Sequence, residues 1–260
     1  MRWAGILRNN TLWRISLTIE RLFANNIIQF GDCYDHMKPI ANNTIDTVLT
    51  DPPYGMDFQS KRSKNGPRYE KIVSDDKVDP LWLKQAYRVT KLGGALIMFC
   101  DWKTSDEWKY HIEKCGYVMK SQVIWNRMHH GTGDLHGSFA PMHDIIWYAT
   151  KGRRIFYKSS AYDTRPKSVL SHKRPSPSED NGHPTCKPVE LLRELIKGTD
   201  DGSDGVILDP FLGSGSTAVA CIKERKRFIG IEIDKKYHDI AVKRTIAEYK
   251  KLGDGLWSKL

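Results

Sequence analysis

Short apolar runs, separated by glycine, proline and polar turns, recur along most of this chain. Their Ile, Val, Leu and aromatic content and the turn residues around them predict buried strands. Strands are predicted at residues 27–30, 45–50, 95–99, 118–125, 144–149, 206–211 and 227–232. Helices are predicted at residues 80–91, ending at Gly93-Gly94, at 104–114 and at 235–252.

This alternation of strands and helices predicts an α/β fold, in which a mostly parallel sheet has helices on both faces. The runs at 118–125 and 144–149 have no helix between them, so we expect an antiparallel pair at one edge. With 260 residues, the chain fits one large domain with insertions better than two independent domains.

Four carboxylates lie at the predicted strand ends: Asp32, Asp51, Asp209 and Glu232. In an open α/β sheet, ligands bind outside the carboxyl ends of the strands. We therefore expect these side chains, which are far apart in the sequence, to converge on one crevice.

The sequence Asp51-Pro52-Pro53-Tyr54 follows one of these strands. Each proline fixes its own φ and removes a backbone donor, so Asp51 and Tyr54 are held on a stiff turn. A carboxylate and a free prolyl carbonyl can accept both hydrogens of an exocyclic amine on a nucleobase, while the tyrosine ring stacks on the base. The alternative interpretation is an ordinary proline turn after a strand.

A glycine turn, Gly213-Ser214-Gly215-Ser216, connects another strand to a predicted helix. Glycine lets the backbone pass close to a ligand, and the start of a helix offers free N–H groups. Glu232 lies 19 residues beyond Gly213 and suits two ribose hydroxyls, a spacing that also fits a dinucleotide-binding enzyme that transfers hydride. However, Asp209-Pro210-Phe211 departs from that fingerprint, and a strand-end carboxylate suits a cationic ligand such as S-adenosylmethionine. The chain has no Gly-x-x-x-x-Gly-Lys-Ser/Thr motif, which argues against nucleotide hydrolysis.

Together, these motifs resemble those of the beta-class amino DNA methyltransferases, which methylate adenine N6 or cytosine N4. The matching pieces, in the order that defines the class, are Gly31-Asp32-Cys33, Asp51-Pro52-Pro53-Tyr54, His183-Pro184-Thr185-Cys186-Lys187-Pro188, the run from Asp209 to Ser216, and Gly230-Ile231-Glu232-Ile233-Asp234. The resemblance covers about residues 26 to 250. It implies a circularly permuted, Rossmann-like methyltransferase fold with a mostly parallel, seven-stranded sheet.

The resemblance also implies roles for individual residues. Catalysis is expected at Asp51, Pro52, Pro53 and Tyr54. Binding of S-adenosylmethionine is expected at Asp32, Cys33, Asp51, Thr185, Lys187, Asp209, Phe211, Gly213, Ser214, Gly215, Ser216, Glu232 and Ile233. Glu232 would hold the ribose, and Thr185 and Lys187, before a helix that begins near Pro188, would bind the cofactor carboxylate. A solvated lysine at the start of a helix is the alternative interpretation for Lys187.

No metal site is expected. His129, His130, His136 and His143 lie close together in the sequence, but their spacing matches no common zinc pattern, and methyl transfer to an amine needs no metal. A loop between two strands that faces the substrate explains them better.

Positive charge points to a polyanionic partner. The chain has 41 Lys and Arg against 31 Asp and Glu, and residues 151–175 hold eight basic residues against Asp163 alone. Release of counterions from phosphates would make such binding weaken with salt. A solvated charged face is the alternative interpretation. Nucleic-acid contacts are predicted at Lys61, Arg62, Lys64, Arg68, Arg153, Arg154, Arg165, Lys167, Lys173 and Arg174.

We divide the chain into an N-terminal extension (1–25), a catalytic half (26–150), a basic target-recognition insertion (151–182) and a cofactor-binding half (183–260). The extension is expected to dock on the domain or to form a homodimer interface. No run approaches the roughly 18 apolar residues of a membrane helix. Five scattered cysteines without a Cys-x-x-Cys motif indicate a reducing compartment. Together with the resemblance, this implies a cytoplasmic protein that is bacterial, archaeal or phage-encoded.

In the resembled class, aspartate at the first position of the catalytic turn is commoner in adenine enzymes. Asp51 therefore favours a site-specific N6-adenine methyltransferase that acts on double-stranded DNA. Single-stranded DNA and RNA stay open as substrates, as does N4 of cytosine. Two rival interpretations also stay open: a non-catalytic nucleic-acid-binding subunit with this fold, and a subunit of a larger restriction or modification assembly.

Overall fold

A computed structural model describes residues 26–55, 77–131, 136–154, 165–176, 186–200 and 204–257. Several predicted features lie outside these residues. They are the N-terminal extension, Thr185 and the basic residues Lys61, Arg62, Lys64 and Arg68.

The described strands form one sheet in the order β1-β8-β7-β2-β3-β5-β4-β6. Their bounds are β1 Ile27–Phe30, β2 Ile45–Thr50, β3 Thr90–Cys100, β4 Val118–Asn126, β5 His143–Thr150, β6 Val169–Ser171, β7 Val206–Asp209 and β8 Arg227–Glu232. All neighbouring pairs from β1 to β3 are parallel, while β5 runs antiparallel to both β3 and β4. The predicted α/β, mostly parallel fold is therefore confirmed.

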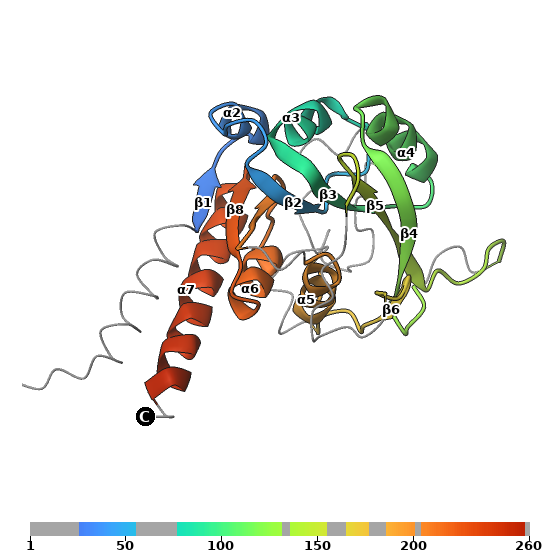
Figure 1. Cartoon of the computed structure of the whole chain (residues 1–260). Helices are drawn as coiled ribbons and strands as arrows, with labels where there is room; N and C mark the ends of the chain where they lie inside the picture. Colours follow the sequence, from blue (N-terminus) through green and yellow to red (C-terminus); the bar gives the residue numbers. More distant parts are fainter. Residues whose placement is uncertain are drawn as a thin grey trace, which may run out of the picture.

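Helices cover both faces of the sheet (Figure 1). The bounds are α2 Cys33–Met37, α3 Leu81–Val89, α4 Ser105–Lys114, α5 Val189–Gly198, α6 Ser216–Lys223 and α7 Lys235–Trp257. Along β2 and β3 successive side chains alternate between the two layers, because a strand directs them to opposite faces. Val48 and Leu96 pack with α2, α3 and α4, whereas Leu49 and Ile97 pack with α5, α6 and α7.

The structure corrects three details of the prediction. The sheet has eight described strands rather than seven, because β6, inside the predicted insertion, pairs in parallel with β4, which is consequently not an edge strand. Helix α3 ends at Val89 rather than at Gly93-Gly94, and β3 begins at Thr90 and includes both glycines. The backbones of Gly93 and Gly94 exchange hydrogen bonds with Lys151. Helix α7 continues past residue 252 to Trp257.

None of the helices in the described part of the chain combines the length and the apolar composition needed to cross a membrane.

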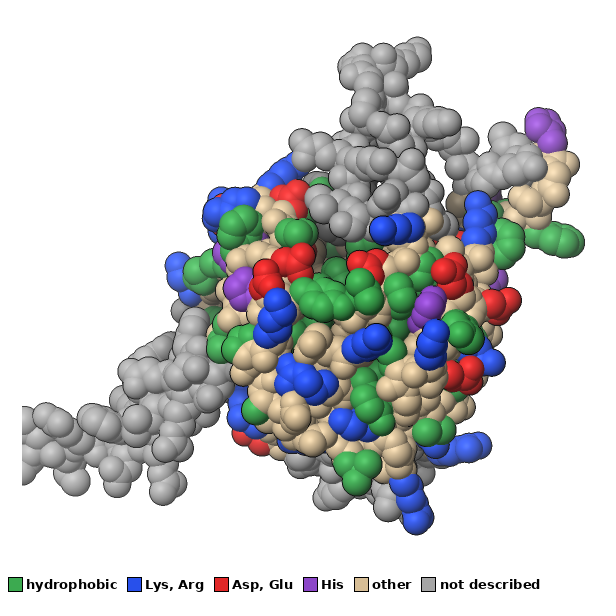
Figure 2. All heavy atoms as spheres, turned by 90° about the horizontal axis from the view of Figure 1, so that it is seen from above, with side chains coloured by type: hydrophobic (Ala, Val, Ile, Leu, Met, Phe, Trp, Pro, Cys, Tyr) green, Lys and Arg blue, Asp and Glu red, His purple; other side chains and the backbone are tan. Residues whose placement is uncertain are grey.

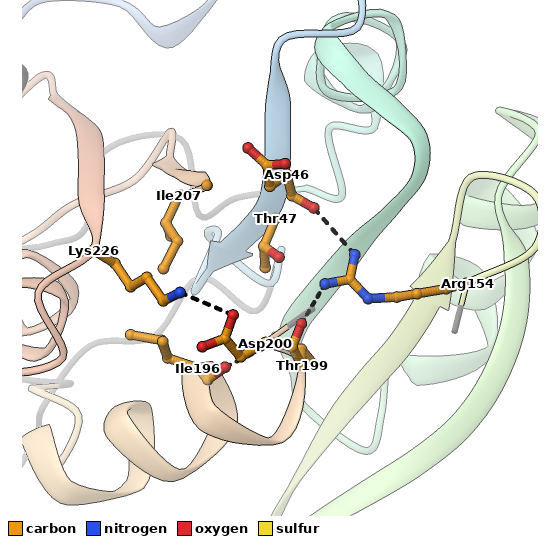
Figure 3. A pocket seen from close by; sticks show the side chains of 9 residues that line it. Asp46, Thr47, Arg154, Ile196, Thr199, Asp200, Ile207 and Lys226 are labelled. Atoms are coloured by element: carbon orange, nitrogen blue, oxygen red, sulfur yellow. Dashed lines mark hydrogen bonds and ion pairs between the residues drawn. The ribbon is translucent and has the colours of Figure 1, made fainter. Parts of the chain in front are cut away.

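Charged residues form a compact cluster at the amino edge of the sheet, where β2 and β7 begin (Figure 3). Arg154 donates to the backbone carbonyls of Gly93 (2.8 Å), Asp46 (3.4 Å) and Thr199. Nearby, Lys226 pairs with Asp200 at 2.8 Å. Both Nη atoms of the Arg154 guanidinium thus donate to backbone carbonyls within the protein.

We expect Arg154→Ala to lower the free energy of unfolding by about 2 to 3 kcal/mol, because three backbone carbonyls lose a charged donor. The adjacent Arg153, which is exposed, is the matched control. Arg153→Ala should change the free energy of unfolding by less than about 0.5 kcal/mol. Urea denaturation measures both values, and similar small effects would contradict a structural role for Arg154.

Candidate active site at the carboxyl edge of the sheet

The four predicted carboxylates lie at or just beyond the ends of four adjacent parallel strands. In the order β1-β8-β7-β2, Asp32 follows β1, Glu232 and Asp209 end β8 and β7, and Asp51 follows β2. Glu232 and Asp209 are buried, Asp51 is half-buried and Asp32 is exposed. The four carboxylates therefore share one edge of the sheet, as the sequence predicts, and their convergence on one crevice stays a prediction.

Asp51 is held from two sides. The Tyr54 hydroxyl donates to its Oδ1, and the Lys187 ammonium donates to its Oδ2. Burial and the neighbouring Asp51 carboxylate raise the pKa of Tyr54 well above its usual value, so its hydroxyl stays protonated and remains a donor. Lys187 directly precedes Pro188, the N-cap of α5, and is buried. This placement contradicts the interpretation of Lys187 as a solvated lysine.

Asp209 links two strands. Its Oδ1 accepts from the Thr50 hydroxyl at 2.8 Å and from the Phe211 amide at 3.1 Å. Burial raises the pKa of Asp209 to about 6, although these hydrogen bonds and one from Thr217 oppose the rise.

Glu232 fixes the glycine turn. Its Oε2 accepts from the Gly213 amide at 2.6 Å, and its Oε1 accepts from the Asp234 amide at 2.8 Å. Burial raises the pKa of Glu232. The carboxylate thus determines the conformation of the loop that faces it.

The backbone conformation favours glycine at both glycine positions of the turn, and packing adds a second requirement at Gly215. Both have a positive φ, +55° at Gly213 and +85° at Gly215. A Cβ on Gly215 would lie 2.8 Å from the Cβ and 2.9 Å from the Cα of Ala241 on α7. The missing side chain of Gly215 therefore permits the packing of α7, and the approach of a ligand to its backbone stays a prediction.

Arg244 on α7 was not identified from the sequence. Its Nη1 donates to the Ser214 carbonyl at 2.6 Å, to the Ser214 hydroxyl at 3.1 Å and to the Ser216 hydroxyl at 3.3 Å. The Ser216 hydroxyl also lies 3.3 Å from the Cys186 Sγ. No sequence signal marks Arg244, which lies 30 and 28 positions from the serines it holds.

The remaining predicted cofactor residues surround this turn and β1. Phe211 packs edge-on against Trp82, with ring centroids 5.3 Å apart, and Ile233 is exposed. Asp32 is the N-cap of α2 and accepts from the Tyr34 amide at 2.7 Å. Burial raises the pKa of the Cys33 thiol to about 12, so Cys33 stays protonated.

The basic stretch at 151–175 does not form one surface. Arg153 and Arg154 follow β5, which runs antiparallel to β3, and so lie at the amino edge, opposite Asp51. Arg154 donates there to carbonyl oxygens of the protein, and the nucleic-acid contacts of both residues stay predictions. Lys173 and Arg174 follow β6 and lie exposed at the carboxyl edge, and Arg165 and Lys167, before β6, are also exposed.

The described part of the connection from β4 to β5 projects from the body of the molecule at this same edge (Figure 2). It exposes Met128, Met142 and Phe139, the last of these completely. Its base is rigid, because Arg127 donates to the Pro141 carbonyl at 2.6 Å and to Asp144 Oδ1 at 3.0 Å. In the described part of the chain, no three His, Cys, Asp or Glu side chains are grouped so that they could hold a metal.

Comparisons with known proteins agree with this geometry. A family model described as DNA methylase, of the N6/N4 type, matches residues 45–243. The chain is 28% identical over 247 residues to the Type II methyltransferase M.HinfI of Haemophilus influenzae, which covers 85% of this chain and 68% of that protein.

Two solved structures share the fold. The M1.HpyAVI–SAM complex superposes with a TM-score of 0.64 and 25% identity, covering 84% of this chain and 98% of that one. The PvuII DNA methyltransferase, named as cytosine-N4-specific, superposes with a TM-score of 0.69 and 15% identity, covering 89% and 93%. The predicted methyltransferase fold class is thus confirmed.

The raised pKa of Asp209 predicts a pH-dependent stability. The folded chain binds this proton more tightly than the unfolded chain, so the stabilising contribution is fully present below about pH 4 and is lost as the pH rises through about 6. Relative to Asp209→Asn, the wild-type free energy of unfolding should fall by about 2 kcal/mol between pH 4 and pH 7. Urea denaturation at several pH values measures this difference, and parallel curves for the two proteins would contradict it.

Proposed function

Because the chain belongs to the N6/N4 DNA methylase family, whose members use S-adenosylmethionine to methylate an exocyclic amine of DNA, we propose that its target is N6 of an adenine flipped out of duplex DNA. The observation that carries this proposal is the Asp51-Pro52-Pro53-Tyr54 turn at the carboxyl edge, beside two buried carboxylates.

The donor set of this edge fits the cofactor. S-adenosylmethionine, when bound, supplies an electrophilic methyl group on a positively charged sulfur. Asp209 and Glu232 provide negative charge in a region of low solvent exposure, where it attracts a cation strongly. In this proposal Glu232 also holds the ribose, while Phe211, Gly213 and Ile233 line the site.

Asp51 prepares the target amine. Its carboxylate and the carbonyl of the prolyl turn accept the amine hydrogens, which concentrates the nitrogen lone pair for attack, and the Tyr54 ring stacks on the base. The target nitrogen forms a bond to the methyl carbon while the carbon–sulfur bond breaks and its electron pair stays on sulfur. The methylated amine then releases one proton, to Asp51 or to water.

Asp51 also favours adenine over cytosine, since aspartate at this position is commoner in the adenine enzymes of the class. N4 of cytosine is the second candidate, because the shared fold includes a protein named as cytosine-N4-specific. Both amines need the same preparation, so the product must be identified directly.

A DNA-binding surface is proposed at the carboxyl edge. Lys173 and Arg174 supply positive charge there, and Met128, Phe139 and Met142 supply exposed apolar surface on the projecting β4–β5 connection. Phosphate contacts would position the duplex, and an apolar side chain could fill the space left by the flipped base.

The homodimer and a restriction partner stay predictions.

The proposed function is tested with tritiated-methyl S-adenosylmethionine and separate duplex DNA, single-stranded DNA and RNA. After digestion to nucleosides, labelled N6-methyldeoxyadenosine is expected from DNA. Asp51→Ala should abolish labelling and leave cofactor affinity, measured by titration calorimetry, nearly unchanged. Label in N4-methylcytosine would establish the second candidate, and transfer retained by Asp51→Ala would exclude Asp51 from the mechanism.

Phe139→Ala is expected to reduce methylation of a fully paired duplex by about 10-fold or more, because opening the duplex loses its apolar wedge. Methylation of the same target opposite an abasic site, where the base is already unpaired, should be nearly unaffected. Leu92→Ala is the matched control, since Leu92 is also exposed but lies on β3 toward the opposite edge. Equal losses on both substrates would argue against a wedge.

A further inference from the structure

Lys187 occupies a buried position beside Asp51. Only 10% of the Lys187 side chain and 20% of the Asp51 side chain are exposed where the two pair. The ammonium lies 5.8 Å from the centre of the Tyr54 ring and 5.1 Å from that of Phe99. Aromatic faces attract a cation, but a buried ammonium still needs a negative partner, and Asp51 provides it.

The described titratable groups that interact with Asp51 and Tyr54, apart from Lys187 itself, are neutral or negative. Asp209, Cys100 and Tyr54 interact with Asp51, and Asp144 interacts with Tyr54. Burial raises the pKa values of Cys100 and Tyr54, so both stay uncharged. In the described part of the chain, Lys187 therefore supplies the positive charge of this cluster.

We propose that Lys187 is a positioning residue for methyl transfer, whose ammonium holds the Asp51 carboxylate turned toward the target amine. This inference rests on the proposed function, in which Asp51 accepts hydrogens from that amine. Among the described residues, the Tyr54 hydroxyl and the Lys187 ammonium use one lone pair on each Asp51 oxygen, and a second lone pair on each oxygen can accept from the substrate.

The alternative role, binding of the cofactor carboxylate, makes a different prediction. Lys187→Met keeps much of the side-chain volume and removes the charge. If Lys187 positions Asp51, kcat on duplex DNA should fall about 10- to 100-fold, while the Kd for S-adenosylmethionine stays within about 2-fold of the wild-type value. The acid limb of the kcat against pH profile should move to higher pH, because the carboxylate loses the charge that stabilises its ionised form.

Lys187→Arg keeps the charge and serves as the conservative variant. It should leave the acid limb near its wild-type position and retain a kcat between those of the wild type and Lys187→Met. This variant also keeps the test decisive if Lys187→Met fails to fold. Lys226→Met is the matched control, since Lys226 forms a similarly buried pair with Asp200 at the amino edge, and it should change neither kcat nor the pH profile.

Two results would overturn the inference. One is a Kd for S-adenosylmethionine weakened about 10-fold or more in Lys187→Met, with kcat recovered at saturating cofactor. The other is an acid limb that does not move in Lys187→Met, which would reduce Lys187 to a packing role. A wild-type protein that labels no nucleic acid would refute the proposed function itself, a result distinct from both.

Discussion

Burial of carboxylates at the ends of adjacent strands is the constraint on which the local structure depends. A carboxylate withdrawn from water needs hydrogen-bond donors or a cation. Glu232 accepts hydrogen bonds from the amides of Gly213 and Asp234. Asp209 accepts from the Thr50 hydroxyl and the Phe211 amide. Asp51 accepts from the Tyr54 hydroxyl and the Lys187 ammonium. Each carboxylate thereby fixes a different loop, so the groups that would bind ligands also hold the edge of the sheet together.

The strands and the edge that gathers the carboxylates could be predicted because local signals suffice for them. Apolar runs and turn residues define β1, β2, β7 and β8, and parallel strands bring their carboxyl ends together. The partners of the side chains could not be predicted. Lys187 pairs with Asp51, 136 positions away in the sequence, and Arg244 on α7 donates to the Ser214 carbonyl in the glycine turn. Such contacts depend on which helices and strands pack together, and the periodicity of the sequence does not predict that.

The basic residues show the reverse, because residues that are close together in the sequence lie far apart in the fold. Residues 151–175 read as one basic segment, but β5 ends at the amino edge and β6 ends at the carboxyl edge. Lys151 donates to the carbonyls of Tyr87 and Thr90, and Arg154 to those of Gly93 and Thr199. These two cations stabilise the sheet, and only the later part of the segment lies where the candidate site is.

The position of β2 between β3 and β7 also governs how the chain can fold as it is made. One side of β2 pairs with β3 early, but its other side must wait for β7, and the bond from the Val206 amide to Asp46 spans 160 positions. At the usual speed of protein synthesis, that interval lasts roughly 10 to 30 s. Throughout it the nascent chain presents an unpaired apolar strand, the kind of edge that aggregates or recruits chaperones. A chain released from the ribosome in this interval would therefore carry the Asp51 turn on an incomplete sheet with an unpaired edge.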